Sequence, residues 1–361
     1  MKNFLLITAV TCAALVSCNK KAPSNIQIPA DNGLQECSFM AFNGIGTKGY
    51  VESELFADTP YNKLHKPNYE PTEANDAREM LISSYLTPQS GFPGTYFKEA
   101  TYRYSDTDEL WHNFNGDELS PIYWPIGGQL DFLALSVTEN IPEGDLIWNE
   151  DNVAQSFTLK AGDNFKQDDI LFASVCGRKI GADPKVEMEF NHAQAWIQFQ
   201  LNAGGTQTGA SVVNVLKVEL IDIYSKGDVT VYNNLGNAFA KWDFRKETRS
   251  DVKMDDTYEV CGTEETPKYL VPKEGVEGKD SDTIGYMDML IPEQQKTAFR
   301  ITYTLKGQEA NVLTYYYELE HENWLMGHKY IYKIDFGTNE ITVDPSVVTF
   351  NGTTDYEYPE N

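Results

Sequence analysis

The chain has 361 residues and carries 29 Lys and Arg against 54 Asp and Glu, which gives a formal net charge of −25. This acidic excess argues against nucleic acid and anionic membrane surfaces as partners of the folded part, because proteins that bind them present basic surfaces. A hydrophobic content of 41% excludes a disordered chain, and five cysteines are too few for a disulfide scaffold. At roughly 150 residues per domain, the length predicts two domains.

The start of the chain predicts an exported lipoprotein. A positively charged start precedes the uncharged apolar run Phe4–Val16, which is shorter than the ~20 residues that span a bilayer. The run ends at Cys18 in a segment that resembles the lipobox of bacterial lipoprotein precursors, where the cysteine thiol receives the lipid. We therefore expect a signal peptide at residues 1–17, lipidation of Cys18 and a tether at residues 18–33. The alternative is an ordinary signal peptide that contains this cysteine by chance.

Most of the remaining sequence is typical of β-strands, after a polar stretch at residues 44–77 that is expected to form an exposed loop. Apolar and polar residues alternate with period two, most clearly at residues 197–201, 216–220, 301–305, 313–319 and 330–336. Turn signals separate these runs, which predicts an all-β fold of antiparallel sandwiches. A turn-rich stretch at 178–185 favours an N-terminal domain at 34–182 and a C-terminal domain at 183–361.

The sequence contains none of the usual catalytic motifs. A Gly-x-Ser-x-Gly elbow, a phosphate-binding glycine loop and a His-Glu-x-x-His zinc motif are all missing. Asp106–Glu109 lacks the glycine and the distal glutamate of a calcium loop, so a solvated turn is the better interpretation. His192 has no partners at metal-ligand spacing and is expected to be a buried structural residue. We therefore predict no enzyme activity, no cofactor and no metal site.

Three cysteines remain once Cys12 leaves with the signal peptide and Cys18 is lipidated. An odd number leaves at least one thiol outside any disulfide. We expect Cys37, Cys176 and Cys261 to be small core residues, and a single bridge between two of them is the alternative.

Six short motifs, in order along the chain, resemble one known family. They are the lipobox, the strand Cys37–Phe42 with the loop Gly46–Gly49, Tyr123–Pro125 followed by Leu130–Ala134, Asp169–Ala173, Phe190–Ala195, and Trp324–Tyr330. Together they resemble the fimbrillin family, the subunits of the type V pili of Bacteroidales bacteria. The resemblance implies two tandem transthyretin-like, Greek-key antiparallel β-sandwich domains.

The resemblance also implies a function and a maturation route. Fimbrillins reach the cell surface as lipoproteins of the outer membrane, and a trypsin-like protease then cuts after the first strand. A strand from the next subunit fills the groove, so the expected partners are other pilin subunits, the outer membrane and the maturation protease. By this resemblance the removable strand is Cys37–Phe42, and the candidate cleavage sites are Lys48 and, as second choice, Arg78.

The C-terminal segment is the candidate donor strand. Residues 341–350 place Ile341, Val343 and Val347 on one face, with Phe350 at the end. The alternative is an ordinary last strand that stays in its own domain. Asp282-Thr283-Ile284 resembles an O-glycosylation acceptor of these bacteria, which makes Thr283 a candidate modification site.

The leading hypothesis is thus a stalk, minor or tip subunit of an adhesive pilus, whose adhesion ligand the sequence does not identify. A monomeric surface glycan-binding lipoprotein is the first alternative. A secreted hydrolase is a second alternative, which the missing catalytic motifs disfavour.

Overall fold

The fold is all-β in the parts of the chain that the computed structural model describes. These are residues 35–43, 79–105, 108, 110–116, 118–137, 141–149, 156–161, 170–179, 185–202, 213–234, 237–254, 260–270, 285–320, 322–337, 341–349 and 355–356. The described helical structure is one short 3-10 turn, η3 (Lys246–Thr248), so the predicted all-β class is confirmed. Nowhere in the described ranges does a helix reach the length and apolar character of a membrane span.

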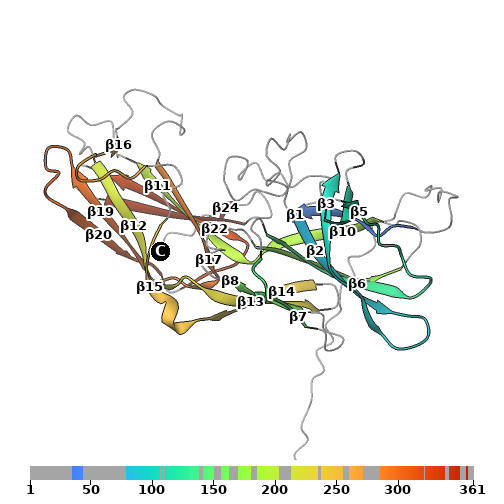
Figure 1. Ribbon diagram of the computed structural model, residues 1–361. Coiled ribbons are helices and arrows are strands. Elements are labelled where there is room, and N and C mark those ends of the chain that lie inside the picture. Colours follow the sequence, from blue (N-terminus) through green and yellow to red (C-terminus); the bar gives the residue numbers. More distant parts are fainter. Residues whose placement is uncertain are drawn as a thin grey trace, which may run out of the picture.

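The largest sheet has eight strands and closes on itself (Figure 1). Its order is β1-β10-β9-β6-β2-β3-β4-β5, and a pairing between Phe39 and Trp111 also joins β1 to β4. Neighbouring strands run antiparallel, except that β1 and β10 are parallel. The strands are β1 (Ser38–Asn43), β2 (Glu79–Thr87), β3 (Gly94–Ser105), β4 (Leu110–Asn115), β5 (Glu118–Leu119), β6 (Gln129–Val137), β9 (Leu171–Arg178) and β10 (Lys185–His192).

Side chains alternate between two cores along these strands. On β6, Phe132 and Ala134 pack inside the closed sheet, while Leu133 and Leu135 pack on its outer side. A four-stranded sheet of order β14-β13-β8-β7 contributes the rest of that outer core. Its strands are β7 (Leu146–Asn149), β8 (Ser156–Ala161), β13 (Gly227–Asn234) and β14 (Asn237–Phe244).

Two further sheets form a sandwich around a third core. One has the order β17-β11-β22-β23-β24, and the other has the order β15-β12-β19-β20 with β16 paired to β12. Pairs are again antiparallel apart from β11 and β22. The strands are β11 (Gln194–Asn202), β12 (Val213–Tyr224), β15 (Arg249–Lys253), β16 (Tyr269–Leu270), β17 (Gly285–Pro292), β19 (Ala298–Leu305), β20 (Leu313–Glu318), β22 (His328–Phe336), β23 (Ile341–Thr349) and β24 (Asp355–Tyr356), with the small pair β18 (Gln294–Gln295) and β21 (Asn323–Trp324) beside them.

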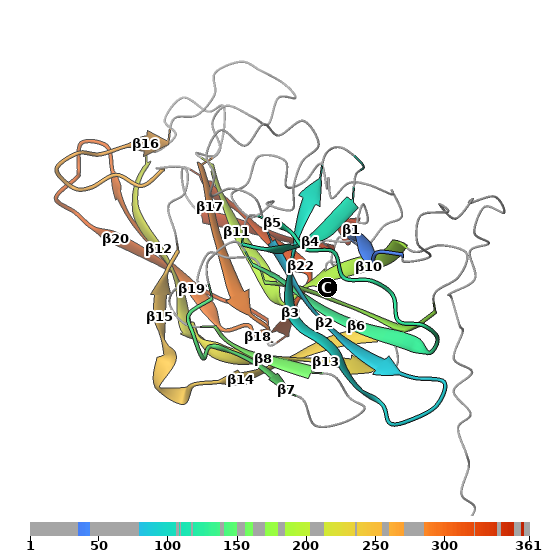
Figure 2. The same cartoon turned by 45° about the vertical axis from the view of Figure 1, so that its right-hand side comes forward.

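The molecule is elongated, with the closed sheet at one end and the C-terminal sandwich at the other (Figures 1 and 2). Sheet pairing crosses the predicted division at residues 182 and 183. β10 pairs with β1, and the hairpin β13–β14 pairs with β8. The linear boundary stays a prediction. None of the described cysteines, Cys37, Cys176 and Cys261, forms a disulfide.

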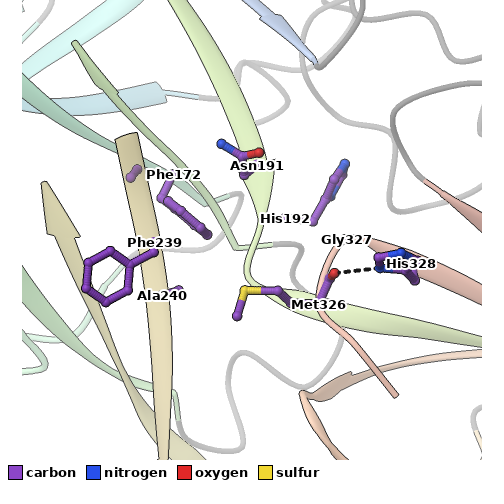
Figure 3. A pocket seen from close by; sticks show the side chains of 9 residues that line it. Phe172, Asn191, His192, Phe239, Ala240, Met326, Gly327 and His328 are labelled. Carbon is purple, nitrogen blue, oxygen red and sulfur yellow. Dashed lines mark hydrogen bonds between the residues drawn. The ribbon is translucent and has the colours of Figure 1, made fainter. Parts of the chain in front are cut away.

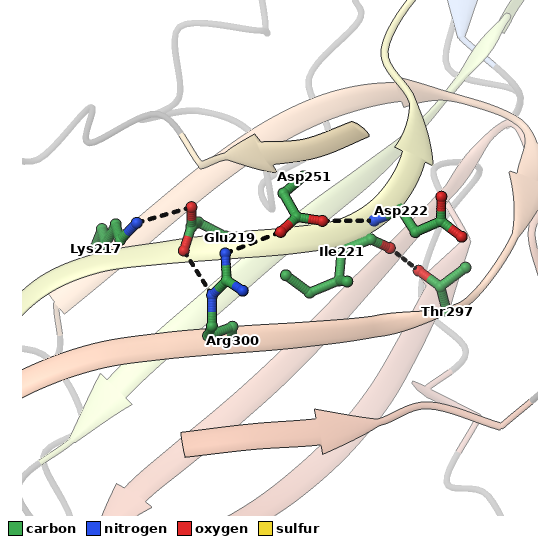
Figure 4. Close-up of polar contacts among 7 residues, drawn as sticks. All are labelled: Lys217, Glu219, Ile221, Asp222, Asp251, Thr297 and Arg300. Atoms are coloured by element: carbon green, nitrogen blue, oxygen red, sulfur yellow. Dashed lines mark hydrogen bonds and ion pairs between the residues drawn. The ribbon is translucent and has the colours of Figure 1, made fainter. Parts of the chain in front are cut away.

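An ion-pair network crosses the outer face of the C-terminal sandwich (Figure 4). Glu219 on β12 accepts hydrogen bonds from Lys217 and Arg300, both at 2.9 Å, and Arg300 also binds Asp251 at 2.9 Å. The other oxygen of Asp251 accepts the backbone N–H of Asp222, which has a left-handed φ of 53° in an irregular stretch of β12. Burial raises the pKa of Glu219, but the hydrogen bonds from Arg300 and Lys217 outweigh burial and leave the pKa below its usual value.

Replacing Glu219 by Gln is expected to lower the free energy of unfolding by about 1–2 kcal/mol at neutral pH, because a charged acceptor is lost. Since folding lowers the pKa of Glu219, its contribution is present above the unfolded pKa and lost as the pH falls through the folded pKa. Urea unfolding at pH 7 and at pH 3.5 measures this difference. Glu318→Gln, an exposed glutamate on β20, is the control, and equal losses in the two variants would contradict the prediction.

Candidate functional site

The first strand, β1, lies in a groove between strands that are distant in sequence. It pairs with β10 in parallel from Ser38 with Lys185 to Asn43 with Phe190. Just before β1, the N–H of Cys37 donates to the carbonyl of Ile122 at 2.7 Å. The backbone therefore has partners on both sides at the start of β1, and on one side along most of the strand.

The side chains of β1 fill the inside of the closed sheet. Cys37 and Phe39 are fully buried, and Ala41 packs against the same core. The Phe39 ring meets Tyr102 and Phe132 edge-on, with centroids 4.8 and 5.2 Å away. Burying one such phenylalanine stabilises the fold by about 1.5–3 kcal/mol. Taking β1 out would leave an apolar groove with an open strand edge.

Two titratable groups, the Tyr102 hydroxyl and the Cys37 thiol, are buried at this groove. Within the described residues, the Tyr102 hydroxyl is buried with no hydrogen-bond partner, and burial raises its pKa. Burial, assisted by the charge of Glu36, raises the pKa of the Cys37 thiol to about 12, so the thiol stays protonated. A protonated, buried thiol is a packing group rather than a nucleophile.

A histidine holds the residue that leads into β1. Nδ1 of His112 on β4 lies 3.0 Å from a carboxylate oxygen of Glu36, and Nε2 lies 2.9 Å from Asp108. Burial lowers the pKa of His112, but the hydrogen bonds and charges of Glu36 and Asp108 outweigh burial and raise the pKa above 6.5. The sequence analysis missed His112, because its partner Glu36 is far away along the chain.

The structure describes only part of the predicted site residues. Cys18, Lys48, Arg78, Thr283 and Phe350 lie outside the described residues. The predicted first strand, Cys37–Phe42, corresponds to β1 and the residue before it. In the sequence, Lys48 and Arg78 both fall between the end of β1 and the start of β2.

The candidate donor segment forms β23. It pairs with β22 from Ile341 to Thr349, but on its other side it meets β24 only at Val347 and Val348. Val347 is buried, while Ile341 and Val343 are partly buried against the core of the C-terminal sandwich. β23 therefore lies near the border of its sheet, with one apolar face covered.

A separate pocket of about 340 Å³ lies beside the edge strand β14 (Figure 3). It is lined by Phe172, Asn191, His192, Ala238, Phe239, Ala240, Met326, Gly327 and His328. His192 is buried at the end of β10, and Nδ1 of His328 lies 2.9 Å from the carbonyl of Met326. Among the described residues, no three His, Cys, Asp or Glu side chains gather as metal ligands would.

His112→Gln is expected to lower the free energy of unfolding by about 1 kcal/mol at pH 6 and by less at pH 9, because it removes two charge-assisted contacts. Folding raises the pKa of His112, so its contribution is complete below the unfolded pKa and lost as the pH rises through the folded pKa. Urea unfolding at both pH values tests this expectation. His328→Gln is the control, and a loss that does not depend on pH in His112→Gln would refute it.

The chain is similar to several solved structures. The chain is similar to a protein of Bacteroides ovatus described as a cell-adhesion protein, with 14% identity and a TM-score of 0.50 over 91% of this chain and 99% of that one. A cell-adhesion protein of Bacteroides uniformis matches with 17% identity and a TM-score of 0.49 over 90% of this chain and 100% of that one. A fimbrial protein of Bacteroides vulgatus matches with 14% identity and a TM-score of 0.49 over 75% of this chain and 92% of that one. The likeness to the Bacteroides ovatus protein shows a shared fold.

No curated protein matched the sequence. The sequence model of the fimbrillin-like family, in contrast, matches residues 71–349, which is more than half of the chain. The match includes β2 to β23 and the motifs from Tyr123 to Tyr330 that carried the resemblance. The chain therefore belongs to the fimbrillin-like family.

Proposed function

We propose that the chain is a structural subunit of a cell-surface pilus, in the stalk or in a minor or tip position, that assembles by β-strand exchange. The observation that carries this proposal is the placement of β1. Phe39 is fully buried in a groove formed by β10, β4 and the strands behind them, while β1 has no pairing with its successor in the chain, β2. Along the sequence, β1 is joined to β2 through residues 44–78.

A cut in that link would leave β1 attached by noncovalent contacts alone. Lys48 and Arg78 are the candidate sites for a maturation protease with trypsin-like specificity. Loss of β1 would uncover the unpaired backbone groups of β10 and the apolar hollow under Phe39. An open edge beside an apolar groove accepts an extended strand, whose main chain supplies affinity and whose alternate side chains set the register.

The donor would be residues 341–350 of the next subunit. Ile341, Val343 and Val347 share one face, as the apolar residues of β1 do. β23 is bordered by a two-residue strand on one side, so its release breaks fewer backbone contacts than release of a central strand would. We place the precursor at the outer membrane, anchored through lipid on Cys18, with other pilin subunits as partners.

A chain that lacks residues 341–361 is expected to form no filaments or ladders after limited trypsin treatment, while the full-length chain forms them. The truncated chain keeps its groove and should still bind a synthetic peptide of residues 341–350, which verifies that it is folded. Negative-stain electron microscopy and fluorescence anisotropy of the labelled peptide are the two measurements. The variant Lys48→Ala/Lys63→Ala/Arg78→Ala is the control, because it leaves only Lys66, which precedes Pro67 and resists trypsin, between β1 and β2.

Filaments of normal abundance from the truncated chain would refute donation by this segment. A full-length chain that remains monomeric after the cut, with no peptide binding, would refute strand exchange altogether.

A second candidate function, glycan binding by a monomeric lipoprotein, is supported by the pocket beside β14. Phe239 is half exposed at this pocket and stacks on Tyr232, with ring centroids 5.0 Å apart. Asn191 and two histidines supply polar groups that could bind sugar hydroxyls. An exposed aromatic ring next to hydrogen-bonding groups is a surface that a sugar ring can occupy.

If this second function holds, Phe239→Ala should weaken polysaccharide binding about tenfold or more, because the stacking surface is lost. Affinity electrophoresis in gels with and without polysaccharide measures the change. Tyr316→Ala removes an exposed aromatic ring on β20 and is the control. Equal mobility of the wild-type chain in both gels would exclude this candidate.

A further inference from the structure

Two neighbouring loops at the end of the closed sheet each expose one large apolar side chain. Phe92 lies between β2 and β3, and Ile126 lies between β5 and β6, with relative exposures of 98% and 103%. The turn between β2 and β3, drawn in cyan, lies at the end of the molecule opposite β20 in both views (Figures 1 and 2). Such exposure is unusual for a phenylalanine and an isoleucine, and it marks an interaction surface when the residues are neighbours.

Close packing of the glycine backbone holds the two loops together. Gly128 has a left-handed φ of 86°, and a Cβ atom there would lie 2.7 Å from the carbonyl of Thr87 and 2.9 Å from Cα of Pro88. A Cβ atom on Gly127 would lie 3.1 Å from the side chain of Gln89. Only glycine permits this approach. The two loops therefore lie against each other, and we call their exposed surface the loop-tip face and define it by Phe92, Ile126 and Tyr123.

The loop-tip face carries no charge. Residues 87–97 and 120–130 contain no Asp, Glu, Lys, Arg or His, although the chain as a whole has a net charge of −25. Two copies of such an acidic chain repel each other wherever their charged surfaces meet. A second copy can approach an uncharged, apolar face without this cost.

The loop-tip face is also continuous with the β1 groove. The carbonyl of Ile122 accepts the N–H of Cys37, and the N–H of Trp124 donates to the carbonyl of Gln35 at 2.8 Å. The segment that holds the start of β1 therefore reaches Ile126 two residues later. A subunit whose strand occupied the groove would have its body close to this face.

We propose that the loop-tip face docks against a second copy of this chain and forms the subunit contact outside the exchanged strand. This inference rests on the proposed function, since it assigns the surface that the neighbouring subunit covers in the fibre. The contact is heterologous, because the face lies on the N-terminal sheet and the donor strand on the C-terminal sandwich of the other copy.

The test compares Phe92→Ser/Ile126→Ser with Ile147→Ser, which removes a half-exposed apolar side chain on β7. Sedimentation equilibrium of the uncut chain measures self-association through the loop-tip face alone, because β1 still fills the groove and no strand can be exchanged. We expect the wild-type chain and Ile147→Ser to self-associate weakly, and the double variant to associate about tenfold more weakly or not at all. Unchanged thermal unfolding would show that the double variant is folded, as its fully exposed sites predict.

The same three chains are then cut with trypsin, and filament yield and binding of the 341–350 peptide are measured. Reduced filament yield with unchanged peptide binding in the double variant supports the inference. Equal self-association and equal filament yield in all three chains overturn the inference but do not contradict strand exchange.

Weaker self-association of the double variant, with no filaments from any chain, supports docking through the loop-tip face and refutes the proposed function. Binding to phosphatidylcholine vesicles that only the double variant loses, with no change in self-association, would assign the face to a membrane and overturn the inference.

Discussion

The burial of Phe39 is the contact on which the N-terminal half of the structure depends. β1 joins the two ends of the eight-stranded sheet, pairing with β10 on one side and meeting β4 on the other. The core inside that sheet consists of side chains from β1, β2, β3, β4, β6, β9 and β10, so it is closed only while β1 is in place. The described part of the fold thus relies on a six-residue strand that is joined to β2 through residues 44–78.

The fit of β1 to its groove is good in its apolar contacts and imperfect in its polar ones. Phe39 makes two edge-on aromatic contacts, which add to the stabilisation from burial. The buried Tyr102 hydroxyl has no partner among the described residues, and an unsatisfied hydroxyl of this kind costs about 1–3 kcal/mol. A strand that offered this hydroxyl an acceptor would bind the groove more tightly than β1 does.

Period-two alternation in the sequence predicted where the strands lie better than it predicted which strands pair. The alternation at residues 197–201, 301–305 and 330–336 predicted β11, β19 and β22, because side chains on the two faces of a strand meet different environments. The parallel pairing of β1 with β10 and the antiparallel pairing of β13 with β8 join segments far apart in sequence, and alternation alone does not select between partners. The family resemblance, and not alternation, indicated β1, and neither indicated the role of His112, whose partner Glu36 is distant in sequence. No sequence pattern predicted that Phe92 and Ile126 would be exposed on neighbouring loops, since a single apolar residue in a loop shows no periodicity.

Charge and topology together limit how copies of this chain can meet. Repulsion between acidic surfaces acts over roughly the Debye length of 8 Å in physiological salt, so charged surfaces oppose contact before side chains touch. The uncharged segments 87–97 and 120–130 lie beside the β1 groove, whereas β23 belongs to the other sandwich. Under the proposed strand exchange, a contact that joins the β1 groove to β23 of the next copy is heterologous, and such contacts build an open fibre when the rotation between copies does not close a ring. On this proposal, the uncharged segments 87–97 and 120–130 and the placement of the β1 groove and β23 on different sheets are two independent features that favour a linear fibre.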